Sequence, residues 1–161
     1  HPLEPYHLTE QTRIQRFPDE DVQFSGRLLG GCMDCLIHLT GTRFDQVKQF
    51  NETYKEDGII WFLEACELNV MSIRRAVWHM KNAGWFQYVK GFLIGRPLCY
   101  GEEAFGIDHY RAVTDLLAEY QVPVIMDLDI GHFSPMMPLV CGGTVEVSVC
   151  DGQISITNTW K

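Results

Sequence analysis

Several features that would assign this chain to a common functional class are missing from it. No apolar run approaches the roughly 20 residues that a membrane-spanning helix needs, and no secretory hydrophobic segment is present. Basic residues are in the minority, because 13 Lys and Arg stand against 21 Asp and Glu and give a formal net charge of −8. A nucleic-acid-binding surface is therefore not expected. These absences predict a cytoplasmic protein that binds neither membranes nor nucleic acids.

Cofactor motifs and an obvious nucleophile are also missing. Gly30-Gly31 is not followed by the Gly-Lys-Ser/Thr sequence of a phosphate-binding loop. The Gly-x-Ser-x-Gly elbow of many serine hydrolases does not occur either. The serines that lie outside any strand-to-helix elbow are Ser25, Ser72, Ser134, Ser148 and Ser155. Only Ser134 and Cys66 lie near the polar groups discussed below, so they are the remaining candidates for a nucleophile. Because no cofactor-binding motif is present, no cofactor is expected.

The cysteines do not form a recognisable metal or disulfide framework. There are six in 161 residues, and a chain of this length can bury a proper core without disulfides. Cys32-Met-Asp-Cys35 is a CxxC pair, but no second pair supplies the four ligands of a structural zinc site. We interpret both cysteines as buried structural residues and expect no metal ion. A metal site formed by Cys32, Cys35 and a histidine is the alternative.

The length and composition indicate one globular domain preceded by a less regular segment. Hydrophobic residues make up 46% of the chain, which excludes extended disorder. Residues 1–23 are rich in charge and contain prolines without a helical or strand-like period. We interpret 1–23 as a linker or excursion from a missing amino-terminal domain, and 24–161 as the domain itself.

Strand and helix patterns alternate through the middle of the chain. Apolar runs predict strands at 24–29, 59–63, 89–94 and 122–128, with a tight turn at Gly30-Gly31 after the first. Helical spacing predicts helices at 70–83 and 109–120. Residues 145–149 and 154–157 alternate in period two across Asp151-Gly152, which is typical of a β-hairpin. This order predicts an α/β fold with a largely parallel central sheet and a terminal hairpin.

Polar side chains follow three of the predicted parallel strands. Glu64 follows the strand at 59–63, Arg96 follows the one at 89–94, and His132 follows the one at 122–128 after a glycine. The carboxyl ends of parallel strands lie at one edge of a sheet, where ligands bind in open α/β folds. A carboxylate beside an imidazole is two-thirds of a hydrolase triad. Arg96 could bind a substrate carboxylate or form a structural salt bridge.

Four segments, in order, resemble the carboxyl-terminal domain of the LD-carboxypeptidase family of serine peptidases, which also contains the microcin C immunity proteins. The similarity spans roughly residues 24–150. The segments are Gly26–Gly31 with Leu39–Thr42, Ile60–Glu64, Val89–Arg96, and Pro123–His132 through Pro138–Gly142. One departure is Cys32, at a position where many members have asparagine.

The resemblance implies a Ser-Glu-His triad divided between two domains, with Glu64 as the acid and His132 as the base. The serine would lie in the missing amino-terminal domain. The implied reaction is hydrolysis of the L,D-peptide bond before the terminal D-alanine of murein tetrapeptides during cell-wall recycling, without a metal. The implied fold is a swivelling β/β/α-type domain, and the implied assembly is a homodimer.

Two other functions stay open. Immunity members of the family cleave a peptide-nucleotide instead of a murein peptide. A non-catalytic ligand-binding or dimerisation domain belongs to a different class. Whether the substrate is a murein peptide or a peptide-nucleotide, the 161 residues alone are expected to be inactive, because the nucleophilic serine would lie in the missing amino-terminal domain.

Overall fold

The computed structural model describes residues 4–5, 7–9 and 11–159, and its elements alternate between strands and helices through the centre of the chain. The helices are α1 (Met33–Leu36), α2 (Val47–Thr53), α3 (Val70–Asn82), α4 (His109–Leu117) and the 3-10 helix η1 (Ala118–Tyr120). The main-sheet strands are β1 (Gln15–Phe17), β2 (Val22–Cys32), β3 (Ile59–Glu64), β4 (Val89–Gly95), β7 (Val124–Leu128), β8 (Thr144–Cys150) and β9 (Gln153–Thr159). The strands β5 (Glu103–Ala104) and β6 (Ile107–Asp108) form a small separate sheet.

The main sheet has the strand order β1-β7-β4-β3-β2-β8-β9. Strands β7, β4, β3 and β2 are parallel, whereas β1, β8 and β9 pair antiparallel to their neighbours. The prediction of an α/β fold with a largely parallel central sheet and a terminal hairpin is thereby confirmed. In the hairpin, Asp151 and Gly152 both have positive φ, as a two-residue type I′ turn requires.

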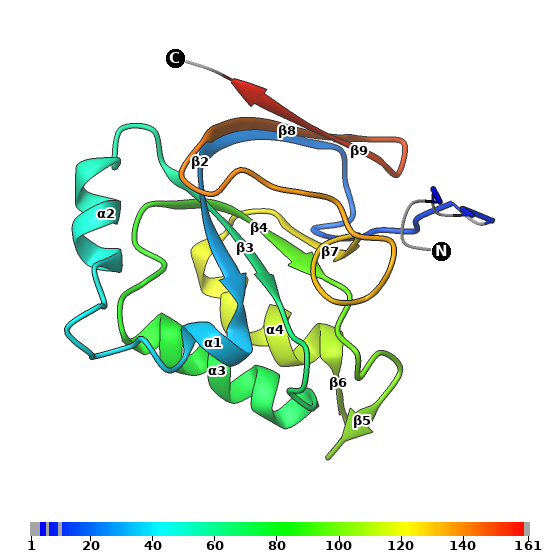
Figure 1. Ribbon diagram of the computed structural model, residues 1–161, viewed down its shortest axis with the longest axis horizontal. Helices are drawn as coiled ribbons and strands as arrows, with labels where there is room; N and C mark the ends of the chain where they lie inside the picture. The colour runs from blue at the N-terminus through cyan, green and yellow to red at the C-terminus, as the bar shows by residue number, and fades with distance from the viewer. Residues whose placement is uncertain (1–3, 6, 10, 160–161) are drawn as a thin grey trace.

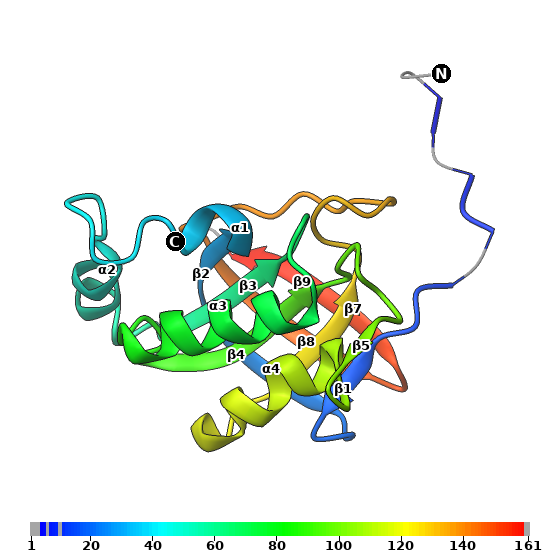
Figure 2. The same ribbon diagram turned by 90° about the horizontal axis from the view of Figure 1, so that it is seen from below.

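Alternate residues of the parallel strands enter two separate cores, one on each side of the sheet. Trp61, Phe92 and Val124 pack beneath α1, α3 and α4, while Ile60 and Leu93 pack on the opposite side. The sheet curls so that β8 and β9 cover this second side, as Figures 1 and 2 show from two directions. Strands buried on both sides explain the nearly continuous apolar runs in the sequence.

The two long helices begin where polar caps occur in the sequence. The Asn69 side chain accepts a hydrogen bond from the Ser72 backbone N–H at the start of α3, and the Asp108 side chain accepts one from the Arg111 backbone N–H at the start of α4. Each cap satisfies a backbone donor that has no partner within its helix. Both helices then cross from one parallel strand to the next.

The prediction of a tight turn at Gly30-Gly31 is wrong, because both glycines lie inside β2. Gly30 has a φ of 155°, and a Cβ added to it would lie 1.8 Å from the backbone oxygen of Phe62 on β3. The glycine therefore lets β2 approach its neighbour and continue to Cys32 at the edge of the sheet.

Part of the predicted linker belongs to the sheet. Residues 15–17 form the edge strand β1, and β2 begins at Val22. Residues 1–3, 6 and 10 of the predicted linker, and 160–161 of the predicted domain, lie outside the described residues. Within the part of the chain that the structure describes, no helix has the length and apolar character needed to cross a membrane.

Candidate active site

Glu64 is the last residue of β3, and its side chain is almost completely buried. Only 6% of the side-chain surface is exposed. Cys32, the last residue of β2, is its partner in the parallel register. A buried carboxylate needs hydrogen-bond partners, because burial removes the water that would otherwise solvate its charge.

His132 comes from the loop that follows β7 and crosses the ends of β4 and β3. Two glycines allow this close crossing. A Cβ added to Gly95 would lie 2.2 Å from the backbone oxygen of Ile130, and one added to Gly131 would lie 2.5 Å from Oε2 of Glu64. Gly131 also has a φ of 104°, which side-chain-bearing residues rarely adopt. The backbone just before His132 therefore lies in direct contact with the Glu64 side chain.

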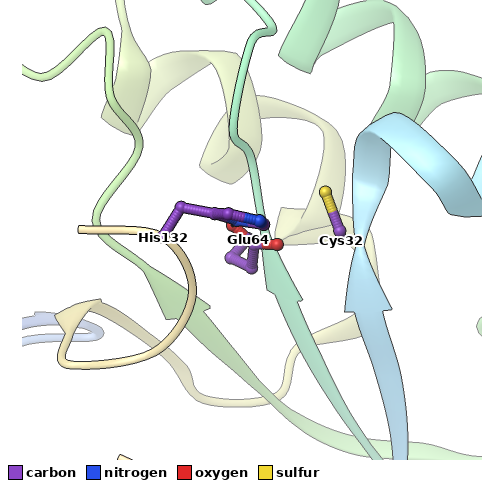
Figure 3. A group of neighbouring side chains, drawn as sticks. All are labelled: Cys32, Glu64 and His132. Atoms are coloured by element: carbon purple, nitrogen blue, oxygen red, sulfur yellow. The ribbon is translucent and has the colours of Figure 1, made fainter. Parts of the chain in front are cut away.

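The structure brings Glu64 and His132 together at a distance of 3.0 Å between Oε2 and Nδ1. Figure 3 shows the imidazole lying over the carboxylate. An ionised carboxylate can only accept, so Nδ1 carries the proton and Nε2 is left with its lone pair. The imidazole side chain is 53% exposed, so solvent or a substrate can reach the ring. The pair can therefore take up and release a proton.

Glu64 also changes the acidity of the imidazole. The hydrogen bond to Glu64, and then the negative charge of that carboxylate, raise the pKa of His132 above its ordinary value. Below the ordinary histidine pKa the pair stabilises the folded chain fully, and this contribution is lost as the pH rises through the raised value. A proton-accepting imidazole is present only above the raised value.

We expect the Glu64→Gln variant to titrate His132 at a lower pH than the unmodified chain does, because an amide carries no charge to stabilise the imidazolium. The measurement is an NMR titration of the histidine ring signals. The matched control is Glu52→Gln, which removes an exposed carboxylate on α2 and should leave the His132 midpoint as it is in the unmodified chain. Equal His132 midpoints in Glu64→Gln and the unmodified chain would contradict the proposed coupling.

Cys32 is the third side chain of this group. The thiol donates a hydrogen bond of 3.4 Å to Oδ2 of Asp34, whose carboxylate also accepts from the backbone N–H groups of Cys66 and Glu67. Burial, followed by the hydrogen bond and charge of Glu64, raises the pKa of Cys32 to about 12. Cys32 is only partly buried and Cys35 is exposed, so the prediction that both cysteines of the CxxC pair are buried is wrong.

Neither of the candidate nucleophiles from the sequence, Ser134 and Cys66, is hydrogen-bonded to His132 in the described part of the chain. In the stretches 4–5, 7–9 and 11–159, no serine hydroxyl is hydrogen-bonded to the imidazole, and Ser134 contributes only its backbone oxygen to a hydrogen bond from Arg96. Burial, and then the charges of Asp34, Glu67 and Glu64, raise the pKa of the Cys66 thiol, which opposes formation of a nucleophilic thiolate.

Arg96 lies on the same edge of the sheet but is engaged with Asp129. Its Nη2 lies 2.5 Å from Oδ1 of Asp129, and its guanidinium lies 5.0 Å from the centre of the Phe133 ring. This ion pair corresponds to the structural alternative considered for Arg96. A role in substrate binding stays a prediction.

A buried polar cluster beneath this edge was not predicted. The Tyr110 hydroxyl donates to Oδ2 of Asp127 at 2.5 Å, and Nε2 of His109 lies 3.5 Å from Oδ1 of the same carboxylate. Burial, and then the hydrogen bond to Asp127, raise the pKa of Tyr110. Asp127 was visible in the sequence as a charge within an apolar strand, but its partners come from α4 and could not be identified without the fold.

Known protein sequences are similar to this chain over most of its length. A family model described as the LD-carboxypeptidase C-terminal domain matches residues 25–147. The microcin C7 self-immunity protein MccF of Escherichia coli is 24% identical over 135 residues, covering 84% of this chain and 37% of that protein. A relative from Vibrio cholerae with a provisional carboxypeptidase name is 23% identical over 125 residues, covering 76% of this chain and 35% of the relative.

Solved structures show the same fold. The wild-type apo structure of MccF has a TM-score of 0.75 and 21% identity, covering 99% of this chain and 44% of that one. Muramoyltetrapeptide carboxypeptidase from Oxalobacter formigenes has a TM-score of 0.66 and 21% identity, covering 86% of this chain and 46% of that one. The chain spans a little over a third of the curated relatives' length and less than half of these two structures.

Proposed function

The chain belongs to the LD-carboxypeptidase C-terminal domain family, and from this we propose that it supplies the acid and the base of a Ser-Glu-His triad. The observation that carries the proposal is the 3.0 Å contact between Oε2 of Glu64 and Nδ1 of His132 at the carboxyl edge of the parallel sheet. Glu64 holds the imidazole in one tautomer and stabilises the imidazolium that forms. His132 deprotonates a serine hydroxyl from an amino-terminal domain of the whole protein.

The proposed reaction is acyl transfer to that serine, followed by hydrolysis. As the serine oxygen attacks the carbonyl carbon, its proton moves to Nε2 of His132. The imidazolium then gives this proton to the departing amine, the terminal D-alanine of a murein tetrapeptide. In the second half, His132 deprotonates a water molecule, which releases the shortened peptide and restores the serine. No step needs a metal or a cofactor.

A second candidate substrate is a peptide-nucleotide. Its support is the similarity to MccF, which aligns over 84% of this chain; one structure of MccF contains aspartyl sulfamoyl adenosine. Glu64 and His132 would act as acid and base on this substrate too. The two substrates would differ only in the groups of the protein that recognise the nucleotide. We also propose that the whole protein is a cytoplasmic homodimer, as the family resemblance implies.

The test is hydrolysis of both substrate types by the whole protein. We expect release of D-alanine from a murein tetrapeptide that ends in D-alanine and no cleavage of the same peptide ending in L-alanine, with the shortened peptide measured by chromatography in both cases. The 161-residue chain alone is the matched control and should show no hydrolysis, because it lacks the serine.

Two outcomes would contradict the proposal. Hydrolysis by the 161-residue chain alone would reject a serine supplied from elsewhere. A gene sequence without a strand-to-helix serine elbow upstream of this chain, together with an inactive whole protein, would favour a non-catalytic binding or dimerisation domain. Cleavage of the peptide-nucleotide alone would keep the triad and replace the substrate.

A further inference from the structure

Cys32 extends the pair of Glu64 and His132 to a group of three potential metal ligands. The parallel register of β2 and β3 places Cys32 and Glu64 side by side, and the loop after β7 adds the imidazole. One ligand atom from each side chain lies within 4.8 Å of the other two. Figure 3 shows the thiol on the far side of the carboxylate from the histidine.

We propose that Cys32, Glu64 and His132 together bind a zinc ion. In a tetrahedral zinc site the Zn–S bond is about 2.3 Å and the Zn–N and Zn–O bonds are about 2.0 Å, so neighbouring ligand atoms lie roughly 3.3–3.6 Å apart. The Oε2–Nδ1 distance of 3.0 Å is slightly below this range, and the upper limit of 4.8 Å is about 1 Å above it. Small rotations of the half-exposed His132 and of the Cys32 side chain would close this difference.

The kinds of ligand favour zinc over the harder divalent ions. A thiolate and an imidazole are soft or borderline ligands, whereas magnesium and calcium prefer oxygen atoms alone. Three protein ligands would leave a fourth position for water, which is the arrangement of an open zinc site. Cys32, Glu64 and His132 come from two strand ends and one glycine-anchored loop, so the backbone positions of the ligands are already set.

Carboxylates around the group support binding of a cation. Asp34 accepts the hydrogen bond from the Cys32 thiol and is itself held by the backbone N–H groups of Cys66 and Glu67. The negative charge of Asp34 therefore lies beside the Cys32 thiol, where it attracts a cation. When zinc binds, the thiol loses its proton to solvent and Asp34 can no longer accept from it.

Zinc at this position would also stop the proposed catalysis, a consequence that rests on the proposed function. Nδ1 of His132 would bind the metal instead of donating to Glu64, and the ring proton would reside on Nε2. One proton, from the thiol, would be released to solvent. With its Nε2 protonated and its Nδ1 on the metal, the imidazole could not accept a proton from serine.

Two other groups of residues provide controls. Cys35 shares the CxxC pair with Cys32 but is exposed and is not within reach of Glu64 and His132. Asp21, Cys150 and Asp151 form a second cluster of potential ligands, and all three are exposed. Substituting Cys35 or Cys150 therefore removes a thiol without altering the proposed site.

The experiment measures zinc affinity of the 161-residue chain by competition with a chromophoric chelator. We expect Cys32→Ser and His132→Gln each to lower the affinity at least about tenfold, since loss of even an outer partner costs about 10- to 100-fold. Cys35→Ser and Cys150→Ser should leave it unchanged. Thermal unfolding of each metal-free variant checks that it is folded. Cobalt provides a second probe, because a thiolate-to-cobalt absorption band should form in the unmodified chain and disappear in Cys32→Ser.

Unchanged affinity in Cys32→Ser, or a loss confined to Cys150→Ser, would overturn the proposal. If Cys32→Ser fails to fold, the unmodified chain still decides the matter, because zinc must shift the NMR signals of the His132 ring. Absence of that shift at saturating zinc would overturn it as well.

The inhibitory consequence is tested separately in the whole protein. We expect zinc to stop D-alanine release at the concentration at which it binds the 161-residue chain, and Cys32→Ser to need at least about tenfold more zinc. If zinc binds through these three residues and release continues, the metal site is supported and the role of His132 as the base is contradicted.

Discussion

Replacing His132 with alanine in the whole protein is expected to lower kcat/KM for D-alanine release by about 10,000-fold or more, because removal of a triad base leaves only binding and oxyanion stabilisation. Glu64→Gln should lower it by a similar factor of about 10,000, since an amide supports the wrong tautomer of the imidazole. The double variant should be little worse than either single one, because the two side chains act as a unit.

The matched control for the histidine is His79→Ala, on the exposed surface of α3 away from the carboxyl edge of the sheet. The matched control for Glu64→Gln is Glu52→Gln. Glu52 lies on α2, is exposed, and forms an ion pair with Lys55 just after that helix. Both controls should keep nearly full activity. Turnover of His132→Ala or Glu64→Gln within tenfold of the unmodified protein would reject the catalytic assignment.

Gly131→Ala is expected to lower kcat by about 100-fold, because displacement of a catalytic group by roughly 1 Å has an effect of this size. The added Cβ would lie 2.5 Å from Oε2 and 2.7 Å from Cγ of Glu64, so either the carboxylate or the loop must move. Movement of either one separates Glu64 from Nδ1 of His132. Steady-state kinetics and the NMR titration of His132 measure the two consequences independently.

Gly142→Ala separates this effect from backbone strain. Gly142 lies in the segment between β7 and β8, has a φ of 81°, and would place its added Cβ in open space. Both variants carry a backbone penalty on the order of 1 kcal/mol, but only Gly131→Ala should change kcat and the His132 midpoint. Equal kinetic losses in the two variants would mean that Gly131 acts through stability and not through the position of Glu64.

The strands of the parallel core were predictable because each is buried on both sides and therefore apolar throughout. The expected strands at 59–63, 89–94 and 122–128 match β3, β4 and β7 to within two residues. Local chemistry misled the interpretation at Gly30-Gly31, where two glycines usually indicate a turn. Here Gly30 lets β2 lie against the backbone of β3, because a Cβ at this position would lie 1.8 Å from the backbone oxygen of Phe62, a residue far along the chain.

Residues of the candidate site differ in how far the sequence revealed them. Glu64 and His132 could be placed together because both follow parallel strands, and the carboxyl ends of such strands share one edge. Cys32 could not, since its position beside Glu64 depends on β2 continuing through the two glycines to the end of β3. The partner of Arg96 was likewise unknown until the loop after β7 brought Asp129 to it.

The sequence by itself determined the alternation of strands and helices, the parallel order that follows from it, and the edge at which an acid and an imidazole must emerge. It could do so because burial and helical period act over a few residues. Only the tertiary structure decided that the imidazole lies 3.0 Å from the carboxylate and that a thiol lies beside them. Those contacts depend on strand register and on loops crossing at glycines, which join residues distant in the chain and leave no local pattern.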